Sequence, residues 1–184
     1  MEPVAVAEPP RTRCAMAMEP NERARLIERY AAGPGRLRQA LAAVPAPAMQ
    51  WRPEPDAWSA HEVAVHCADS ETQAASRIRV LTSEKEPLIV GYDQDAWARD
   101  HDYHAHPVDL ALAVVDAVRA STAALLRRLP EAAWAREGRH TESGRYTAED
   151  WLRIYAEHLE GHARQIEDNA AAWTRHRRGG AGAR

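Results

Sequence analysis

Apolar residues recur every three or four positions in four stretches of the chain, the spacing that an amphipathic helix requires. The first stretch opens near Asn21, a good N-cap, and the second opens at Ser59, where Ser-Ala-His-Glu matches a capping box. The third starts around Pro107 and ends at Pro130, and the fourth opens at Thr147. The pattern therefore predicts four long helices.

The apolar positions also predict which face of each helix is buried. These inward positions are Leu26, Ile27, Tyr30, Leu37, Leu41 and Val44 in the first stretch; Val63, His66, Cys67, Ser70, Ala74, Ile78 and Leu81 in the second; Leu112, Val115, Val118, Thr122, Leu125 and Leu129 in the third; and Trp151, Leu152, Tyr155, His158, Leu159, His162 and Ile166 in the fourth.

The segments between these helices differ in length. Gly33-Pro34-Gly35 interrupts the first helix and predicts a kink or a break there. Residues 45–58 form a proline-rich link, and residues 84–106 form a long crossover with a short helix near Asp93–Asp100. Four amphipathic helices with long connections predict an all-α fold, a four-helix bundle with a long crossover connection.

Both ends of the chain differ in composition from the middle. Residues 1–18 begin acidic, contain Pro9-Pro10 and lack the charged segment and apolar core of a secretory signal. We expect a disordered leader, or an upstream start codon with the true start at Met16 or Met18 rather than Met1. Residues 176–184 are basic and glycine-rich, which predicts a disordered tail after a domain that spans residues 19–175.

Composition and charge narrow the class of partner. A chain of 184 residues suits one domain, and its net charge of -3 argues against a dedicated binder of nucleic acid or anionic membranes. No apolar run approaches the ~18 residues of a membrane span. The two cysteines, Cys14 and Cys67, suggest free thiols in a reducing cytoplasm. We therefore expect a cytoplasmic protein with a small-molecule partner.

Histidine is about twice as frequent as usual, and three of the nine histidines face the predicted core. His158 and His162 are four residues apart, which places both rings on one helix face about 6 Å apart at Cβ. His66 lies on the inward face of the second helix. Each buried ring nitrogen without a partner costs about 1 to 3 kcal/mol. Neighbouring hydroxyl or carbonyl groups could satisfy these rings, or one divalent metal ion could bind all three and keep an open position. The spacing alone does not decide between hydrogen-bonded core histidines and ligands of one metal ion.

Other polar residues near these histidines have two interpretations each. Glu62 and Asp69 lie one turn either side of His66, where they could orient its ring or face solvent. Gln165 follows His162 by nearly one turn and could contact a bound ligand or lie on the surface. Cys67 is expected to be a small core residue. We expect the remaining candidates at the surface, and the alternative is that they border a pocket. These candidates are His101, His104, His106 and His140.

Two segments of the sequence resemble those of one known family. The run from Trp58 to Glu71 resembles the W-S-x-x-E-x-x-x-H-x-x-D-x-E segment of DinB-like proteins, and the run from Trp151 to Ile166 resembles their H-x-x-x-H-x-x-Q-I segment. Gly91–Gln94 and Trp134–His140 also match, so the resemblance covers about residues 20–172. These proteins are four-helix bundles that typically bind a divalent metal through three histidines.

The resemblance implies a set of ligands and a range of activities. By position, the metal ligands would be His66, His158 and His162. Zn, Ni, Fe or Mn would suit three imidazoles. Some DinB-like proteins are S-transferases or isomerases that use low-molecular-weight thiols, in which the metal would bind the sulfur as a thiolate. In a hydrolase, the same open position would activate water. A homodimer is a further expectation from the family.

We therefore predict a metal-dependent transferase of the low-molecular-weight thiol S-transferase type, or a hydrolase, acting on a small molecule. A non-catalytic bundle that binds a divalent metal or a small ligand is the alternative. A third interpretation is a structural dimerisation module in which the histidines are satisfied core groups.

Overall fold

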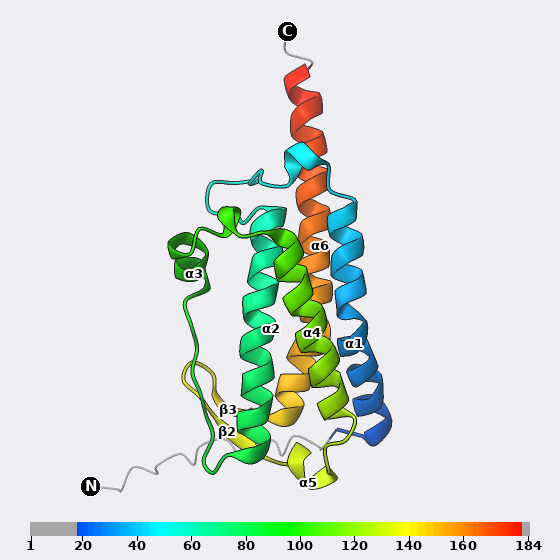
Figure 1. Cartoon of the computed structure of the whole chain (residues 1–184), viewed down its shortest axis with the longest axis vertical. Helices are drawn as coiled ribbons and strands as arrows, with labels where there is room; N and C mark the ends of the chain where they lie inside the picture. The colour runs from blue at the N-terminus through cyan, green and yellow to red at the C-terminus, as the bar shows by residue number, and fades with distance from the viewer. Residues whose placement is uncertain (1–17, 182–184) are drawn as a thin grey trace, which may run out of the picture.

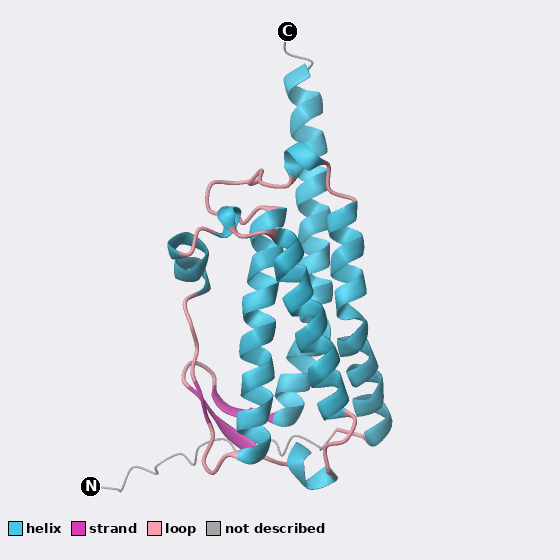
Figure 2. Ribbon diagram, in the orientation of Figure 1, coloured by secondary structure: helices cyan, strands magenta, loops and turns pink. Residues whose placement is uncertain are grey.

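Four long helices lie side by side in the computed structural model, which describes residues 18–181, and a small sheet lies at one end of them (Figure 2). This architecture confirms the predicted all-α four-helix bundle. The long helices are α1 (Pro20–Ala42), α2 (Ala60–Ser83), α4 (Val108–Leu126) and α6 (Ala148–Ala181). The shorter elements are η1 (Ala46–Ala48), β1 (Leu88–Ile89), α3 (Gln94–Asp100), η2 (Tyr103–Ala105), α5 (Glu131–Trp134), β2 (Glu137–His140) and β3 (Gly144–Thr147).

The order of the helices around the bundle differs from their order in the sequence. α1 packs against α6 and α4, and α2 packs against α4 and α6. Residues 43–59 connect α1 to α2 across one end of the bundle, and the crossover that carries α3 runs beside α2 (Figure 1). As a result, α2 and α6, which carry the inward-facing histidines, are direct neighbours although 64 residues separate their ends.

Side-chain caps fix where α2 and α6 begin. The Ser59 hydroxyl accepts a hydrogen bond from the Glu62 backbone N–H, and the Glu62 carboxylate accepts one from the Ser59 N–H, which confirms the predicted capping box. Thr147 and Asp150 form the same reciprocal pair at the start of α6. The two helices therefore present their side chains in a fixed register.

Of the predicted kink or break in α1, the break is wrong, because α1 is one continuous helix that contains Pro34, whereas the kink stays a prediction. Proline has no N–H, so the Tyr30 carbonyl four residues earlier loses its helical hydrogen bond. The Arg119 Nη1 atom donates to this oxygen instead, at 2.6 Å. The start of the helix also differs slightly, since Glu19 is the N-cap and Asn21 lies in the first turn.

The buried face of α4 also differs from the expected one. The structure buries Arg119 on this face, whereas Leu112, Val118 and Leu125 are only partly buried. A charged residue was not expected inside the bundle, but Arg119 is paired there with the buried Glu71. The fully buried α4 positions are Ala111, Val115, Arg119, Thr122, Ala123 and Leu126.

The sequence pattern gave no indication of the small sheet. β1 pairs with β2 in parallel, and β2 pairs with β3 antiparallel, with Glu137 opposite Thr147. Gly144 has φ of 79° after the β2–β3 turn, a conformation that favours glycine. Strands of two to four residues are too short to show a recognisable alternation.

The structure corrects the predicted boundaries of the leader and of the tail. α6 continues to Ala181, so residues 176–181 are helical where a disordered tail was expected. Met18, expected as the last residue of the leader, is buried, and its backbone N–H donates to Glu149. Residues 1–17 and 182–184 lie outside the described residues. Within residues 18–181, no helix is both long and apolar enough to cross a membrane.

Candidate metal centre

Three histidines from two helices meet inside the bundle. His66 of α2 is buried, and His158 and His162 of α6 are partly buried. One ligand nitrogen from each ring lies within 4.8 Å of the others. The ring centres are 5.8 Å apart for His66 and His158, 4.9 Å for His66 and His162, and 4.6 Å for His158 and His162. The structure thus brings together the three histidines singled out in the sequence.

The His158 ring is oriented by Glu71. Nδ1 of His158 lies 2.9 Å from the Glu71 Oε1 atom, and Nε2 lies 3.2 Å from the Ser70 hydroxyl. Because a carboxylate can only accept, the proton belongs on Nδ1, and the Nε2 lone pair accepts from the Ser70 hydroxyl, a hydrogen bond that a metal ion would replace. An imidazole held in this way is the arrangement commonly found behind a metal-bound histidine.

Glu71 is itself held in the charged form by Arg119. Both side chains are almost fully buried, and the Arg119 Nε and Nη2 atoms donate to the two carboxylate oxygens at 2.6 and 2.5 Å. Burial alone would raise the pKa of Glu71, but the hydrogen bond with His158 and the charge and hydrogen bonds of Arg119 together lower it. Glu71 therefore remains an ionised acceptor for His158.

His162 is oriented by a residue of its own helix. Its Nδ1 atom lies 2.9 Å from the Gln165 Oε1 atom, which places the proton on Nδ1. Gln165 thus contacts His162, a role that differs from both expected ones. Burial and the neighbouring His158 lower the pKa of His162 to about 4, so the ring is neutral near pH 7.

His66 has an unsatisfied nitrogen. Its buried Nδ1 atom has no hydrogen-bond partner among the described residues, and its ring packs 4.7 Å from Trp58. Burial, together with His162 and His158, lowers the pKa of His66 to about 3. Neutral imidazoles are the form that binds metal, and three of them suit a divalent ion with an open position. The donor set, with its unpaired buried nitrogen, therefore fits a metal.

The two acidic residues beside His66 have other partners. Glu62 caps α2 and forms an ion pair with Arg52, and Asp69 accepts a hydrogen bond from the Tyr103 hydroxyl. Neither contacts the unsatisfied His66 nitrogen. Cys67 is fully buried, and burial raises the pKa of its thiol, as fits the expected core residue.

The other histidines lie outside the three-histidine cluster. His104 borders a cavity of about 570 Å³, and its Nε2 atom lies 2.8 Å from the Ser59 hydroxyl. The His101 ring packs near Trp97, and the His106 carbonyl contacts the His61 ring. His140 ends β2, with its ring 5.5 Å from that of Tyr146.

Sequence reasoning missed Glu71 and Arg119, two of the residues that position the cluster. Glu71 ends the family-like segment in α2, but its pairing with His158 required knowledge of how α2 and α6 pack. The spacing of Arg119 did indicate a buried position, because it lies four residues after Val115 and three before Thr122, two inward positions of the same helix. An arginine at such a position indicates a buried acidic partner.

The fold and the site together define a class of protein, a helix bundle in which two neighbouring helices present three converging histidines. The chain belongs to the DinB superfamily, whose family model matches residues 29–166. This match confirms the resemblance noted in the α2 and α6 segments.

Similar proteins come from Oceanobacillus iheyensis and Bacillus subtilis. A protein of Oceanobacillus iheyensis, named as a metal-dependent hydrolase, is 32% identical over 109 residues, which cover 59% of this chain and 63% of that protein. The match thus spans less than two thirds of that relative. YfiT of Bacillus subtilis, also named as a metal-dependent hydrolase, is 26% identical over 136 residues, which cover 73% of this chain and 76% of YfiT.

A solved structure of YfiT shares the fold. It superposes with a TM-score of 0.80 at 22% identity, over 86% of this chain and 91% of that chain. It is described as a probable metal-dependent hydrolase with an unusual four-helix bundle topology. The likeness shows that the two proteins have the same architecture.

Proposed function

We propose that His66, His158 and His162 bind one divalent metal ion, and that the protein is a metal-dependent hydrolase acting on a small molecule. The observation that carries this proposal is the convergence of the three ligand nitrogens within 4.8 Å, with two of the rings held by Glu71 and Gln165. When bound, the ion would act as a Lewis acid and lower the pKa of a group in its open position. The names of the relatives support the same activity.

Several residues of the chain have separate roles around this site. Glu71 and Gln165 each accept the Nδ1 proton of one histidine, so that its Nε2 atom carries no proton. The Trp58 ring packs against the His66 ring, with the ring centres 4.7 Å apart. The Ser70 hydroxyl, 3.2 Å from His158 Nε2, is placed to hydrogen-bond a group at the open position.

The second candidate is a low-molecular-weight thiol S-transferase. It is favoured by the cavity of about 570 Å³, which Trp58 and Tyr103 help to line. Because Trp58 also contacts His66, a second molecule in this cavity would lie next to the site. A thiol sulfur held there as a thiolate would be a nucleophile at neutral pH.

One set of assays separates these functions. The protein, loaded in turn with Zn, Ni, Fe or Mn, is offered model esters, amides and lactones, and then model electrophiles with and without several thiols. A metal-dependent hydrolase would turn over the first set without thiol, lose activity to a chelator and regain it with metal. Turnover only with a thiol would identify the S-transferase. Metal binding without any turnover would favour the non-catalytic metal-binding bundle, and His158→Ala is the control.

We also propose that the protein forms a homodimer through α4. Leu110 and Val114 expose 55% and 40% of their surface, and the exposed Ala113 and Ala117 continue the same face. An exposed apolar patch of this kind is typical of a protein interface. Light scattering coupled to size exclusion should report a dimer, and Val114→Glu should yield a monomer. The structural dimerisation module would form this dimer but bind no metal.

A reducing cytoplasmic setting stays a prediction, supported by the free, buried Cys67.

A further inference from the structure

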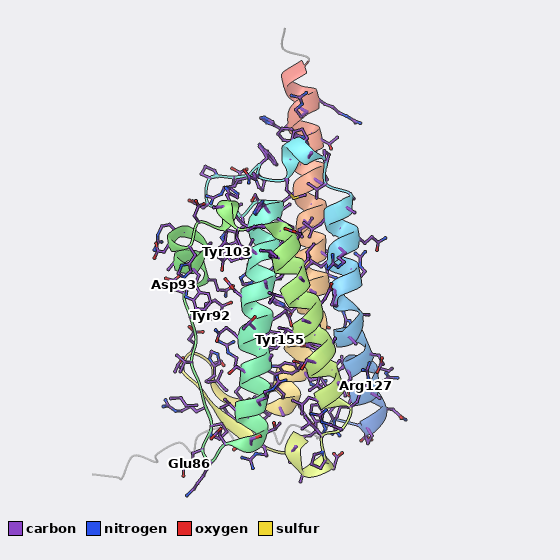
Figure 3. The ribbon with its side chains drawn as sticks, viewed as in Figure 1. Glu86, Tyr92, Asp93, Tyr103, Arg127 and Tyr155 are labelled. Atoms are coloured by element: carbon purple, nitrogen blue, oxygen red, sulfur yellow. The ribbon has the colours of Figure 1, made fainter. Side chains whose placement is uncertain are left out.

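A group of hydrogen-bond donors lies beside the histidine cluster. Ser70 and Arg77 belong to α2, Tyr155 belongs to α6, and Tyr92 lies on the crossover beside α2, where Figure 3 labels it together with Tyr155. The Ser70 hydroxyl is 3.2 Å from Nε2 of His158 and close enough to influence the pKa of both tyrosines. The group therefore adjoins the side of His158 that faces away from Glu71.

Arg77 brings a positive charge without a carboxylate partner among the described residues. Its Nη1 atom donates to the Tyr155 hydroxyl at 3.2 Å, and its Nη2 atom donates to the Val90 carbonyl at 2.8 Å. Its Nε atom is buried and has no hydrogen-bond partner. Arg119 of the same bundle, by contrast, bonds both oxygens of Glu71.

The two tyrosines supply further donors. The Tyr92 hydroxyl is buried and has no hydrogen-bond partner in the described part of the chain, although its ring is held 4.5 Å from Trp97 and 5.8 Å from the Arg77 guanidinium carbon. Burial raises the pKa of Tyr92 to about 12, so the phenol keeps its proton at neutral pH. The Tyr155 oxygen accepts from Arg77, which leaves its own proton free to donate.

The two carboxylates nearest to this group accept hydrogen bonds from other side chains. Asp69 accepts from Tyr103, and Glu71 accepts from Arg119 and His158. Among the described residues, the Arg77 Nε–H and the Tyr92 hydroxyl thus have no hydrogen-bond partner. A carboxylate provides two oxygens in one plane, and this geometry suits a guanidinium flanked by hydroxyl donors.

We propose that Arg77, Tyr92 and Tyr155 bind a carboxylate group of the substrate and hold it beside the three histidines. The proposal rests on the proposed function for the position of the reacting bond, whereas the carboxylate site itself is independent of the metal. Tyr92 lies in the irregular segment between β1 and α3. The substrate class is therefore small organic acids.

Titration with acetate tests this site directly, because acetate is the smallest organic carboxylate that carries carbon substituents. The probes are sodium acetate and acetamide, its neutral counterpart, at constant ionic strength. The readout is the NMR signal of the Arg77 Nε–H and of the Trp97 indole N–H in isotope-labelled protein. We expect a saturable shift with acetate and none with acetamide.

Matched variants identify the residues involved. Arg77→Met and Tyr92→Phe should each raise the Kd for acetate at least fivefold, measured on the Trp97 signal. Arg79→Met, which removes the same charge from the exposed face of α2, should bind acetate as the wild type does. Circular dichroism confirms that each variant is folded.

The proposal would be overturned by no saturable shift with acetate, by equal shifts with acetamide, or by equal losses in Arg77→Met and Arg79→Met. His158→Ala separates this site from the metal centre. It should retain acetate binding, because His158 is not one of the three binding residues. If His158→Ala abolished the shift, acetate would be binding at the histidines, which would also contradict the proposal. A failure of metal binding alone would leave the carboxylate site standing.

Discussion

Arg119 donates a hydrogen bond to the backbone oxygen of Tyr30 at 2.6 Å, and this is the oxygen that Pro34 leaves without a helical donor. The same guanidinium binds both carboxylate oxygens of Glu71, which accepts from His158 at 2.9 Å. A proline in α1 is thus linked, through one buried arginine, to the orientation of a histidine in α6. Stability and site geometry depend on the same side chains.

Replacing Glu71 by glutamine should weaken metal binding. The amide keeps the shape of the side chain but removes the charge that holds the proton of His158 on Nδ1. Loss of such a partner typically lowers metal affinity about 10- to 100-fold. Competition with a chromophoric chelator measures the affinity. Glu157→Gln, an exposed residue of α6, should bind metal as the wild type does, and equal affinity in both variants would contradict the role of Glu71.

Replacing Arg119 by methionine should lower the free energy of unfolding by about 3 to 5 kcal/mol, because Glu71 would remain as an uncompensated buried charge. Urea unfolding followed by circular dichroism measures this loss. Arg36→Met removes an exposed ion pair with Glu167 and should leave the unfolding midpoint nearly unchanged. Similar midpoints for the two variants would show that the buried pair is not important for stability.

Two glycines of α1 offer a matched comparison. A Cβ atom at Gly33 would lie 3.1 Å from both Arg119 Nη1 and Leu159 Cδ1, whereas one at Gly35 would meet nothing within 4 Å. Gly33→Ala should therefore destabilise the protein by about 1 to 3 kcal/mol. Gly35→Ala should stabilise it by up to about 1 kcal/mol, because alanine favours the helix. Thermal unfolding of the two variants should shift in opposite directions, and a shared stabilisation would contradict the tight packing at Gly33.

The metal-free protein should lose stability as the pH falls from about 6.5 toward 4. The pKa of His66 is lowered to about 3 and that of His162 to about 4, so the unfolded chain takes up protons in this window while the folded chain does not. Each group can contribute at most about 1.4 kcal/mol per pH unit. Urea unfolding at several pH values measures the slope. His162→Gln should have a shallower slope, and an unchanged slope would contradict the assignment.

Local signals were sufficient to predict much of the bundle and the histidine cluster. Ser59 and Glu62 form a cap from residues three apart, so the start of α2 could be deduced from sequence alone. His158 and His162 share a helix face because they are four residues apart, and His66 lies on the apolar face of its own helix. These features depend on neighbours along one helix, which the sequence shows directly.

Features that depend on contacts between helices could not be predicted in this way. Pro34 leaves the Tyr30 carbonyl without a helical donor, and Arg119, 85 residues later, supplies one. Glu71 orients His158 across the α2–α6 interface, and Tyr92 reaches the site from an irregular crossover. The periodicity of a single helix contains no information about such partners.

The metal content of the purified protein tests the central claim most directly. Inductively coupled plasma mass spectrometry should find one divalent ion per chain in the wild type and almost none in His158→Ala. His104→Ala, which alters a histidine outside the cluster, should keep its metal. Equal and negligible metal in the wild type and in His158→Ala, after each has been offered Zn, Ni, Fe and Mn, would contradict the three-histidine metal centre.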